Sequence, residues 1–477
     1  MTSPKPATPS IAFVTLGCPK NTVDSEHMLG ALVRDGFRTV GDADGADVAV
    51  INTCAFLQSA VRESKAAIAQ LCELKSRRRL KAILVTGCLA QRAGESLLGE
   101  FPEVDAVLGT GQWREVVGAA RHLLEGGSER VVKQADPGGA LEAGSPRALS
   151  TPRHIAYLKI SEGCDHGCAF CAIPLMRGRH RSFALGDIVH EAQLLEAQGA
   201  REINLVAQDL AHYGRDVRDA KLSLPDVLGA LVRDTTVPWI RMLYLYSAGL
   251  TPALLEMMAT EQRVLPYLDM PIQHASDEVL ARMRRPERQR TIRDKVARIR
   301  SIVPDVAIRT TCIVGFPGET SDDFERLLGF LEETQFDRVG AFTYSAQEGT
   351  RAAELADDVP ESLKRERLER LNEVQRLITA ERYEGRVGKS ARVLIDRVDG
   401  DVVQARTTWQ ADDIDGVTYV SGADALLPGT FADVSLDEVV EDVDFGASLE
   451  AVVLAPASPP RARRSLPVLG TPGSFGR

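Results

Sequence analysis

The sequence predicts an α/β protein of three units: an N-terminal parallel-sheet α/β domain, a central partial barrel of six βα units, and a small C-terminal all-β barrel. Two series of short apolar segments, each followed by a segment of helical period, predict the first two units. Short segments rich in Val and Thr, separated by Gly and Asp, predict the third.

The N-terminal domain is predicted over residues 11–135, after a flexible N-terminus at 1–10. Its strands and helices alternate, which is typical of a parallel sheet with helices on its faces. A segment rich in Pro, Gly, Ala and Ser at 136–152 predicts a linker. The expected strands are Ile11–Leu16, Val48–Ile51, Ala82–Thr86 and Ala106–Leu108, and the expected helices are Val23–Arg34, Ala55–Leu74, Gln91–Leu98 and Gln112–Leu124.

The central unit is predicted over residues 153–380 and ends with a charged helix, Glu361–Glu384. Six βα units are too few for a closed eight-fold barrel, so an open partial barrel is expected. The expected strands are Ala156–Ile160, Ile203–Ala207, Arg241–Leu245, Tyr267–Met270, Ala307–Val314 and Arg338–Thr343, with helices between them such as Leu185–Gln198 and Asp322–Glu333.

The C-terminal barrel is predicted over residues 381–447. A tail rich in Pro, Ala, Ser and Arg follows at 448–477 and is expected to be disordered. The expected strands of the barrel are Ala391–Asp396, Asp401–Thr407, Val417–Val420 and Phe431–Val439.

Composition excludes several classes of protein. The chain has 477 residues, 44% of them hydrophobic, and a formal net charge of −10. No run approaches the ~18 apolar residues of a membrane span, and the first residues lack the apolar core of a secretory signal. We therefore expect a cytoplasmic protein with reduced cysteines. The acidic balance argues against non-specific nucleic-acid binding, which depends on Lys and Arg.

Three cysteines lie close together in the sequence GCDHGCAFC. Cys164, Cys168 and Cys171 have the spacing CxxxCxxC and follow the first expected strand of the central barrel. Catalytic groups of βα barrels lie at this end of the strands. A structural zinc site takes four ligands, whereas only three cysteines are close here. Three thiolates on a four-iron cluster leave one iron open, and an open iron can chelate the amino and carboxylate groups of S-adenosylmethionine.

A second set of cysteines follows the strands of the N-terminal domain. Cys18, Cys54 and Cys88 each come one to three residues after an expected strand. Because the carboxyl ends of parallel strands lie at one edge of a sheet, these three residues are predicted to meet there. They can bind a second cluster, again with one open iron. Cys72 and Cys312 fall inside a helix and a strand, and we interpret both as core residues.

The CxxxCxxC loop of a partial βα barrel resembles the radical S-adenosylmethionine superfamily. The later-strand segment Ile313-Val314-Gly315-Phe316-Pro317-Gly318-Glu319-Thr320 resembles the segment whose backbone packs against the nucleoside in that family. The resemblance implies a [4Fe-4S] cluster on the three cysteines. Expected contacts to S-adenosylmethionine are Gln208, Gln273, Gly315 and Phe316.

The N-terminal cysteines extend the resemblance to the methylthiotransferase family, over about residues 11–443. That family implies a second [4Fe-4S] cluster on Cys18, Cys54 and Cys88, and a small C-terminal TRAM domain. It also implies insertion of a methylthio group into an unactivated C–H bond, with S-adenosylmethionine used twice. One molecule donates a methyl group to sulfur on the auxiliary cluster, and the other yields the radical that abstracts a substrate hydrogen. An electron donor and a sulfur donor are implied as partners.

The substrate is expected to be a protein. Segments such as Leu268-Asp269-Met270-Pro271-Ile272-Gln273-His274-Ala275-Ser276 resemble the branch of the family that modifies an aspartate β-carbon of small-subunit ribosomal protein twelve. Charge points the same way, because residues 386–445 hold five basic and thirteen acidic residues. Such a surface repels tRNA phosphate and suits a basic ribosomal protein. An unspecific solvated surface is the alternative interpretation.

Two other functions stay open at this point. The first is the same chemistry on a tRNA adenosine, which the acidic balance disfavours. The second is a non-catalytic iron–sulfur or zinc module that senses redox state or serves as a scaffold. Some side chains also have two interpretations: His166 is expected to be structural, while two sets of arginines could face the mouth of the barrel or solvent. These arginines are Arg177, Arg179 and Arg181, and Arg282, Arg284 and Arg285.

Overall fold

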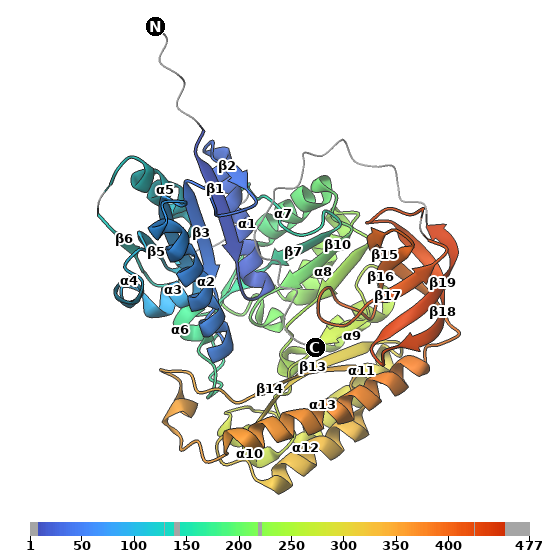
Figure 1. Cartoon of the computed structure of the whole chain (residues 1–477). Coiled ribbons are helices and arrows are strands. Elements are labelled where there is room, and N and C mark those ends of the chain that lie inside the picture. The colour runs from blue at the N-terminus through green and yellow to red at the C-terminus, as the bar shows by residue number, and fades with distance from the viewer. Residues whose placement is uncertain (1–7, 128, 138–143, 218–221, 424, 454–477) are drawn as a thin grey trace.

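The computed structural model describes residues 8–127, 129–137, 144–217, 222–423 and 425–453. The chain forms three units in sequence order, with the central unit between the other two (Figure 1). The predicted tail falls almost wholly on residues 454–477, which lie outside the described residues, as do residues 1–7 of the predicted flexible N-terminus. No helix among the described residues is long and apolar enough to span a membrane.

The N-terminal unit is a parallel six-stranded sheet in the order β2-β1-β3-β4-β5-β6. Its two edge strands extend the four predicted ones; both are three residues long and largely exposed, so they lack an apolar signature. The predicted helix 91–98 is two short helices, because Gly94 takes a φ of +52° between them. The elements are β1 Ser10–Thr15, α1 Pro19–Arg34, β2 Arg38–Val40, β3 Val48–Thr53, α2 Gln58–Ser76, β4 Ala82–Gly87, α3 Cys88–Ala93, α4 Ser96–Glu100, β5 Ala106–Leu108, α5 Val116–Leu124 and β6 Val131–Lys133.

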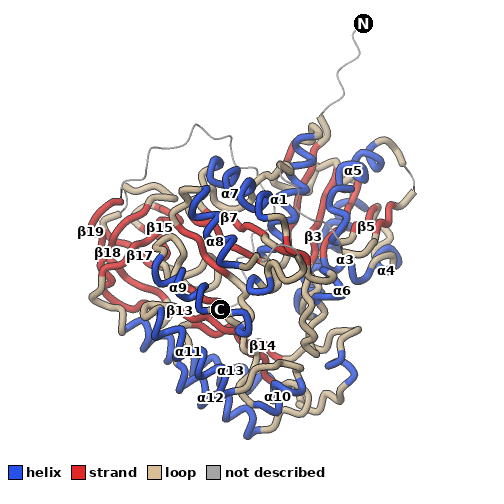
Figure 2. The backbone as a smooth tube through the Cα atoms, turned by 180° about the vertical axis from the view of Figure 1, so that it is seen from behind, coloured by secondary structure: helices blue, strands red, loops and turns tan. Residues whose placement is uncertain are grey.

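The central unit contains the six predicted parallel strands. They form two three-stranded sheets, β11-β10-β7 and β12-β13-β14, which meet where the Leu265 amide donates to the Ile240 carbonyl at 3.0 Å. Helices cover the outer face (Figure 2). The strands are β7 Ile155–Lys159, β10 Glu202–Val206, β11 Trp239–Met242, β12 Tyr267–Asp269, β13 Ala307–Val314 and β14 Arg338–Thr343, and the helices α7 Leu185–Gln198, α8 Leu224–Asp234, α9 Pro252–Thr260, α10 Asp277–Arg282, α11 Gln289–Ile302, α12 Ser321–Thr334 and α13 Glu361–Glu384.

The loop after β7 has its own short elements. A two-stranded ladder of β8 Ser161–Glu162 and β9 Arg181–Ser182 closes the loop, and α6 Ile173–Arg177 lies within it. Helix α6 packs against α3 of the N-terminal unit. On the far side, Arg92 of α3 donates to Gln347 Oε1 at 2.7 Å, beyond the end of β14. The N-terminal unit therefore contacts both ends of the open barrel.

The C-terminal unit is a closed barrel in the order β15-β16-β17-β19-β18. The barrel extends past the predicted boundary at residue 447, because β19 runs to Val453 and supplies a fifth strand. This strand starts Asp-Phe-Gly-Ala-Ser and lacks the β-branched run that marks the other strands. The predicted boundary between 380 and 381 also falls inside α13. The strands are β15 Ser390–Asp399, β16 Val402–Thr407, β17 Thr418–Ser421, β18 Phe431–Val440 and β19 Asp444–Val453.

Buried charges join the C-terminal barrel to the central one. Glu202 of β10 is fully buried and receives Arg241 Nε and Arg406 Nη2, each at 2.7 Å. Burial alone would raise the pKa of Glu202, but the two guanidinium groups outweigh it and lower the pKa below its usual range. Beside this pair, the rings of Trp239 and Phe431 meet edge to face at 5.1 Å. The C-terminal barrel is thus held to the inner face of the central strands.

We predict that Glu202→Gln lowers the free energy of unfolding by about 3–5 kcal/mol, because it removes the counter-charge of the buried Arg241, whereas Arg406 keeps its pairing with Asp396. Urea unfolding measures the change. The exposed pair Arg397–Asp399 supplies the control, and Asp399→Asn should leave the midpoint unchanged. Since the pKa of Glu202 is lowered by folding, its stabilisation is complete above about pH 4.3 and shrinks as pH falls below that value. Equal midpoints for wild type and Glu202→Gln at pH 7 would contradict the prediction.

Candidate active site

The N-terminal cysteines lie at the carboxyl edge of the first sheet, as predicted. Cys18 follows β1 and caps α1, while Cys54 and Cys88 come directly after β3 and β4. Gly17 takes a φ of +100°, and a Cβ there would lie 2.9 Å from the Cβ of Cys54, so only glycine allows this approach. We call these three residues the N-terminal trio.

Asn21 of α1 ties the N-terminal trio together. Its Nδ2 donates to the carbonyls of Leu16 and Thr53 at 2.8 and 3.1 Å, which joins the ends of β1 and β3. Its Oδ1 lies 3.8 Å from the Cys88 Sγ. Burial, and next the neighbouring cysteines Cys18 and Cys88, raise the pKa of Cys54 to about 12. Three thiolates at this edge therefore need positive charge close by.

The second group of cysteines, which we call the loop trio, lies in the loop between β8 and α6. The Cys164 amide donates to the Gly178 carbonyl at 3.0 Å, and the Cys171 amide donates to the Cys168 carbonyl at 3.2 Å. The first bond ties the start of the loop to its far end, and the second forms a turn that holds Cys168 and Cys171 close together. Burial raises the pKa of Cys164 to about 11 and that of Cys171 to about 12.

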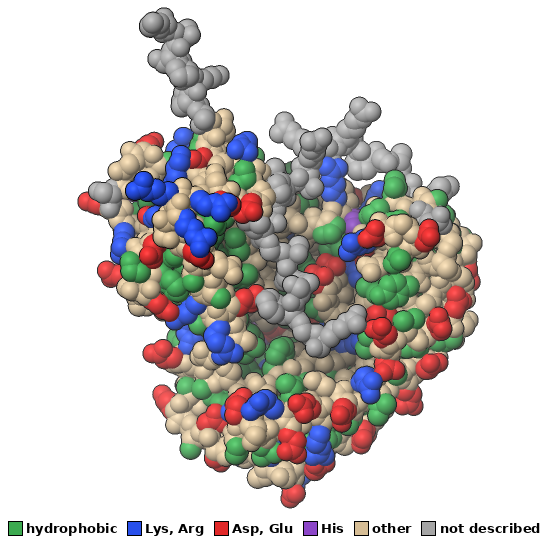
Figure 3. Space-filling view, in the orientation of Figure 1, with side chains coloured by type: hydrophobic (Ala, Val, Ile, Leu, Met, Phe, Trp, Pro, Cys, Tyr) green, Lys and Arg blue, Asp and Glu red, His purple; other side chains and the backbone are tan. Residues whose placement is uncertain are grey.

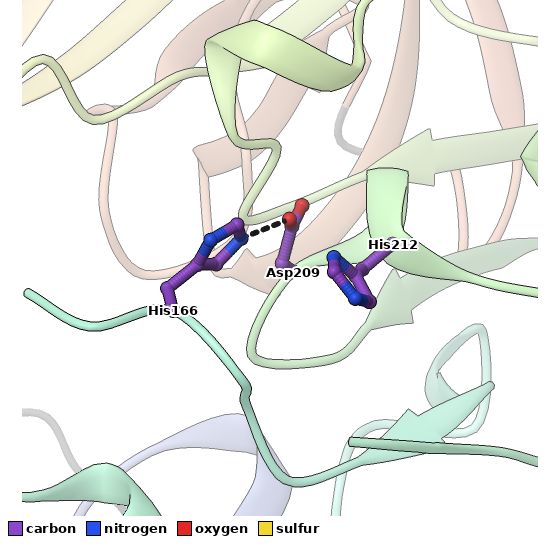
Figure 4. A group of neighbouring side chains, drawn as sticks. All are labelled: His166, Asp209 and His212. Atoms are coloured by element: carbon purple, nitrogen blue, oxygen red, sulfur yellow. Dashed lines mark hydrogen bonds and ion pairs between the residues drawn. The ribbon is translucent and has the colours of Figure 1, made fainter. Parts of the chain in front are cut away.

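His166 lies inside this loop and has structural partners. Its Nε2 is 2.8 Å from Asp209 Oδ2 (Figure 4). Its ring stacks on Tyr246 with a centroid distance of 4.0 Å. The other carboxylate oxygen of Asp209 accepts the backbone amides of Ala211 and Tyr246, each at 3.0 Å. His212 lies beside this pair, but the carboxylate is already used by three hydrogen bonds. We interpret the group as a clamp that fixes the loop to the end of β10, as predicted for His166.

The spacing of the thiols bears on the kind of metal centre. Zinc–sulfur bonds of about 2.3 Å place tetrahedral ligands within about 4 Å of one another. Among the described residues, the group whose three ligand atoms lie within 4.8 Å is His166, Asp209 and His212, and neither cysteine trio meets this limit. Neither trio is therefore gathered as one tetrahedral zinc ion requires, and a set of three thiolates is the donor set that an iron–sulfur cluster takes.

A buried network of charges lies between the N-terminal trio and the strand segment that leads into the loop trio. Arg177 of α6 donates from Nη1 to Asp24 Oδ2 at 2.6 Å and to Glu162 Oε2 at 3.2 Å, while its Nη2 donates to the Asn21 side chain. Lys159 binds Asp24 and also Glu162, the latter at 2.7 Å. Burial would raise the pKa of Glu162, but Lys159 and Arg177 hold it at about 2. We call Asp24, Lys159, Glu162 and Arg177 the junction.

Gln208 continues this network toward the mouth of the barrel. Its Nε2 donates to Glu162 Oε1 at 2.6 Å. Because an ionised carboxylate only accepts hydrogen bonds, it fixes which end of the amide faces it. The Gln208 Oε1 is consequently turned away, and it is buried without a hydrogen-bond partner. Such an oxygen is suited to a positively charged donor.

The other predicted cofactor contacts lie at the ends of β12 and β13. Gln273 has a φ of +72°, and its backbone pairs with Thr311 and Ile313. Gly315 also has a positive φ, +71°, and a Cβ there would clash with Lys364 at 2.3 Å. Phe316 is fully buried and packs edge to face on Tyr344, so its backbone, and not its ring, can meet a ligand.

The arginines that could face either the mouth of the barrel or solvent differ in their burial. Arg177 and Arg285 are each 4% exposed, whereas the Arg179 side chain is 94% exposed. The sequence assigned no role to Asn21, Lys159 and Glu162. Polar and charged residues within five positions of the strand-end cysteines were the signal that could have identified them.

Three family models match the chain. The uncharacterized protein family UPF0004 matches residues 10–109, the radical SAM superfamily matches residues 158–331, and the TRAM domain matches residues 387–449. Curated relatives match nearly the whole length. A protein of Anaeromyxobacter sp. (strain K) is 44% identical over 95% of this chain and 95% of its own. One of Desulforudis audaxviator is 46% identical over 90% of this chain and 95% of its own. Both are named ribosomal protein uS12 methylthiotransferase RimO.

Solved structures show a similar fold. The radical S-adenosylmethionine methyltransferase TsrM from Kitasatospora setae, with tryptophan and an S-adenosylmethionine analogue bound, matches with a TM-score of 0.51. The match covers 70% of this chain and 72% of that one, at 14% identity. At this identity the likeness concerns the fold alone.

We predict that Gly163→Ala destabilises the loop that carries the loop trio. Gly163 has a φ of +80°, and a Cβ would lie 2.0 Å from the carbonyl oxygen of Arg179 in the facing strand region. The strained backbone alone costs about 1–3 kcal/mol. Gly167 is the matched control, because a Cβ there meets no atom within 4 Å. A thermal melt should show a lower Tm for Gly163→Ala than for Gly167→Ala, and coincident melts would refute the prediction.

Proposed function

The chain belongs to the family of ribosomal protein uS12 methylthiotransferases, and on that premise we propose that it inserts a methylthio group at the β-carbon of an aspartate in small-subunit ribosomal protein twelve (uS12). The radical SAM superfamily implies one [4Fe-4S] cluster and S-adenosylmethionine. The observation that carries the proposal is the junction, whose buried bonds run from Asn21, beside Cys88, to Glu162, two residues before Cys164.

We assign the clusters to the trios by the chemistry of their donors. Cys164, Cys168 and Cys171 would hold the cluster that the superfamily implies, with one iron open to S-adenosylmethionine. Cys18, Cys54 and Cys88 would hold an auxiliary [4Fe-4S] cluster with its own open iron. When bound, the first group supplies an electron that cleaves S-adenosylmethionine, and the second supplies the site for the sulfur to be methylated. The chain would need external donors of electrons and of sulfur.

The residues around the trios orient the cofactor and exclude water. The unpartnered Oε1 of Gln208 would accept a hydrogen bond from the α-ammonium group of S-adenosylmethionine, and the bond from Gln208 Nε2 to Glu162 supports this orientation of the amide. The backbones of Gln273, Gly315 and Phe316 would line the nucleoside. The buried aromatic ring of Tyr246 stacks on His166 and lies against Arg285, so it would exclude water on that side of the loop trio. Shielding of this kind suppresses side reactions of a radical.

Surface charge supports a protein substrate. Acidic residues of the C-terminal barrel face solvent, and the view in Figure 3 shows them along the outer edge of this unit. The exposed Arg392 and Arg397 are paired with Asp433 and Asp399, at 2.9 and 3.3 Å. This surface therefore offers little free positive charge to nucleic-acid phosphate and attracts a basic protein.

We predict about eight irons per chain after anaerobic reconstitution, because each trio would hold four. The Cys164/Cys168/Cys171→Ala variant should retain about four, and so should Cys18/Cys54/Cys88→Ala. Iron and sulfide analysis measures both. Cys72→Ala is the matched control, because Cys72 lies within α2 away from either trio, and it should keep about eight. Zinc in place of iron, or four irons in wild type, would contradict the two-cluster assignment.

We further predict that the reconstituted protein modifies purified uS12. With S-adenosylmethionine, a reductant and a sulfur source, the intact mass of uS12 should rise by one methylthio group in place of one hydrogen. Peptide fragmentation should locate the change on an aspartate. A parallel reaction with tRNA provides the comparison. Methylthioadenosine in tRNA together with unmodified uS12 would overturn the substrate assignment and favour the tRNA branch.

A further inference from the structure

Each trio has one buried guanidinium group of its own. Arg177 and Arg285 are both 4% exposed, and they lie on different elements, α6 and the loop after α10. Thiolates bound to a cluster would carry negative charge into surroundings where the cysteine side chains are buried or half-buried. A guanidinium is suited to balance that charge because it stays protonated even when buried.

Hydrogen bonds hold Arg177 next to the N-terminal trio. Its Nη2 and the Cys88 Sγ share one partner, the Oδ1 of Asn21. Its Nη1 is held by Asp24 and Glu162, so the position of the cation is fixed on both sides. Of the two buried lysines nearby, Lys159 is paired with Asp24 and Glu162, and Lys20 lies 3.3 Å from the centroid of the Tyr244 ring and donates to the Ala207 carbonyl.

Arg285 stands in the same relation to the loop trio. Its Nη1 lies 3.8 Å from the Cys168 Sγ. Its Nη2 donates to the Pro271 carbonyl at 2.7 Å and pairs with Glu287 at 3.3 Å. Its plane covers the Tyr246 ring, with 3.9 Å between the guanidinium carbon and the ring centroid. None of these partners belongs to the junction, so the two cations are held by separate sets of residues.

We propose that Arg177 and Arg285 are positioning residues that each set the reduction potential at one trio, so that the two clusters are tuned independently. The inference rests on the proposed function, which requires a cluster at each trio. Reduction adds an electron to a cluster. A fixed positive charge nearby stabilises the reduced form and raises the potential, and its removal lowers the potential. Two separate cations allow one cluster to deliver an electron while the other stays in the state that holds sulfur.

The experiment isolates each cluster within the full chain. In the Cys164/Cys168/Cys171→Ala background the N-terminal trio alone binds iron, and in the Cys18/Cys54/Cys88→Ala background the loop trio alone does. Arg177→Gln, Arg285→Gln and the exposed control Arg179→Gln are placed in both backgrounds. Each protein is reconstituted without S-adenosylmethionine and titrated with dithionite at controlled potential, and electron paramagnetic resonance gives the fraction of reduced cluster.

Arg177→Gln should lower the ratio of reduced to oxidised cluster at the N-terminal trio about tenfold at a fixed potential, which is about 59 mV for one electron. At the loop trio it should match Arg179→Gln. Arg285→Gln should show the reverse pattern. Arg→Lys at either position should leave the reduction potential of the cluster close to that of the Arg179→Gln control, because the positive charge remains.

Two results would overturn the inference. One is an iron-loaded Arg177→Gln whose potential equals that of Arg179→Gln, and the other is equal shifts at both trios. If a Gln variant does not fold, as judged by circular dichroism, the Lys variant is used instead. The arginine has a structural role alone if the iron-loaded Lys variant lowers the ratio of reduced to oxidised cluster tenfold, or if the Lys variant also fails to fold. Failure of the proposed function is distinct, because the backgrounds themselves would then bind no iron at one trio.

Discussion

The buried junction of Asp24, Lys159, Glu162 and Arg177 is the interaction on which the arrangement of the molecule depends. It brings two cations and two anions from the N-terminal unit and the central barrel into one water-poor site. Charges in such a site are tolerated only when each is paired, so the partners fix one another's positions closely. The two units are therefore held in one mutual orientation, and with them the two cysteine trios.

Paired buried charges also cover other parts of the open central barrel. The C-terminal barrel covers the inner strands through Glu202, Arg241 and Arg406, and Arg309 adds a pairing between Asp269 and Asp415. At the opposite end, Arg92 reaches across to the loop after β14. An open barrel of six strands leaves inner polar groups exposed unless neighbours cover them. Here both neighbouring units cover these groups with charged side chains. The mouth of the barrel, which carries the cysteine loop, is left as the site of the proposed reaction.

Much of this could be predicted from the sequence. The βα alternation gave the six central strands, and the positions of Cys18, Cys54 and Cys88 after strands brought them to one sheet edge. The edge strands β2 and β6 were missed because they are short and largely exposed, and β19 because its first half lacks β-branched residues.

The burial of individual charges could not be predicted. Arg177 and Arg179 are two residues apart in one loop, yet one is buried and the other is exposed. Only the three-dimensional packing of α6 against α3 separates them. The roles of the junction and of Gln208 follow from hydrogen bonds between segments far apart in the chain, and no local pattern encodes these.

One measurement tests most directly whether both trios serve a single reaction. Purified uS12 carrying deuterium at the β-carbon of aspartate is incubated with the reconstituted protein, S-adenosylmethionine, a reductant and a sulfur source. The 5′-deoxyadenosine and the modified protein are then analysed by mass spectrometry. We predict that deuterium from the aspartate enters 5′-deoxyadenosine in step with the appearance of a methylthio group on that residue. Formation of 5′-deoxyadenosine without deuterium, while uS12 stays unmodified, would contradict it.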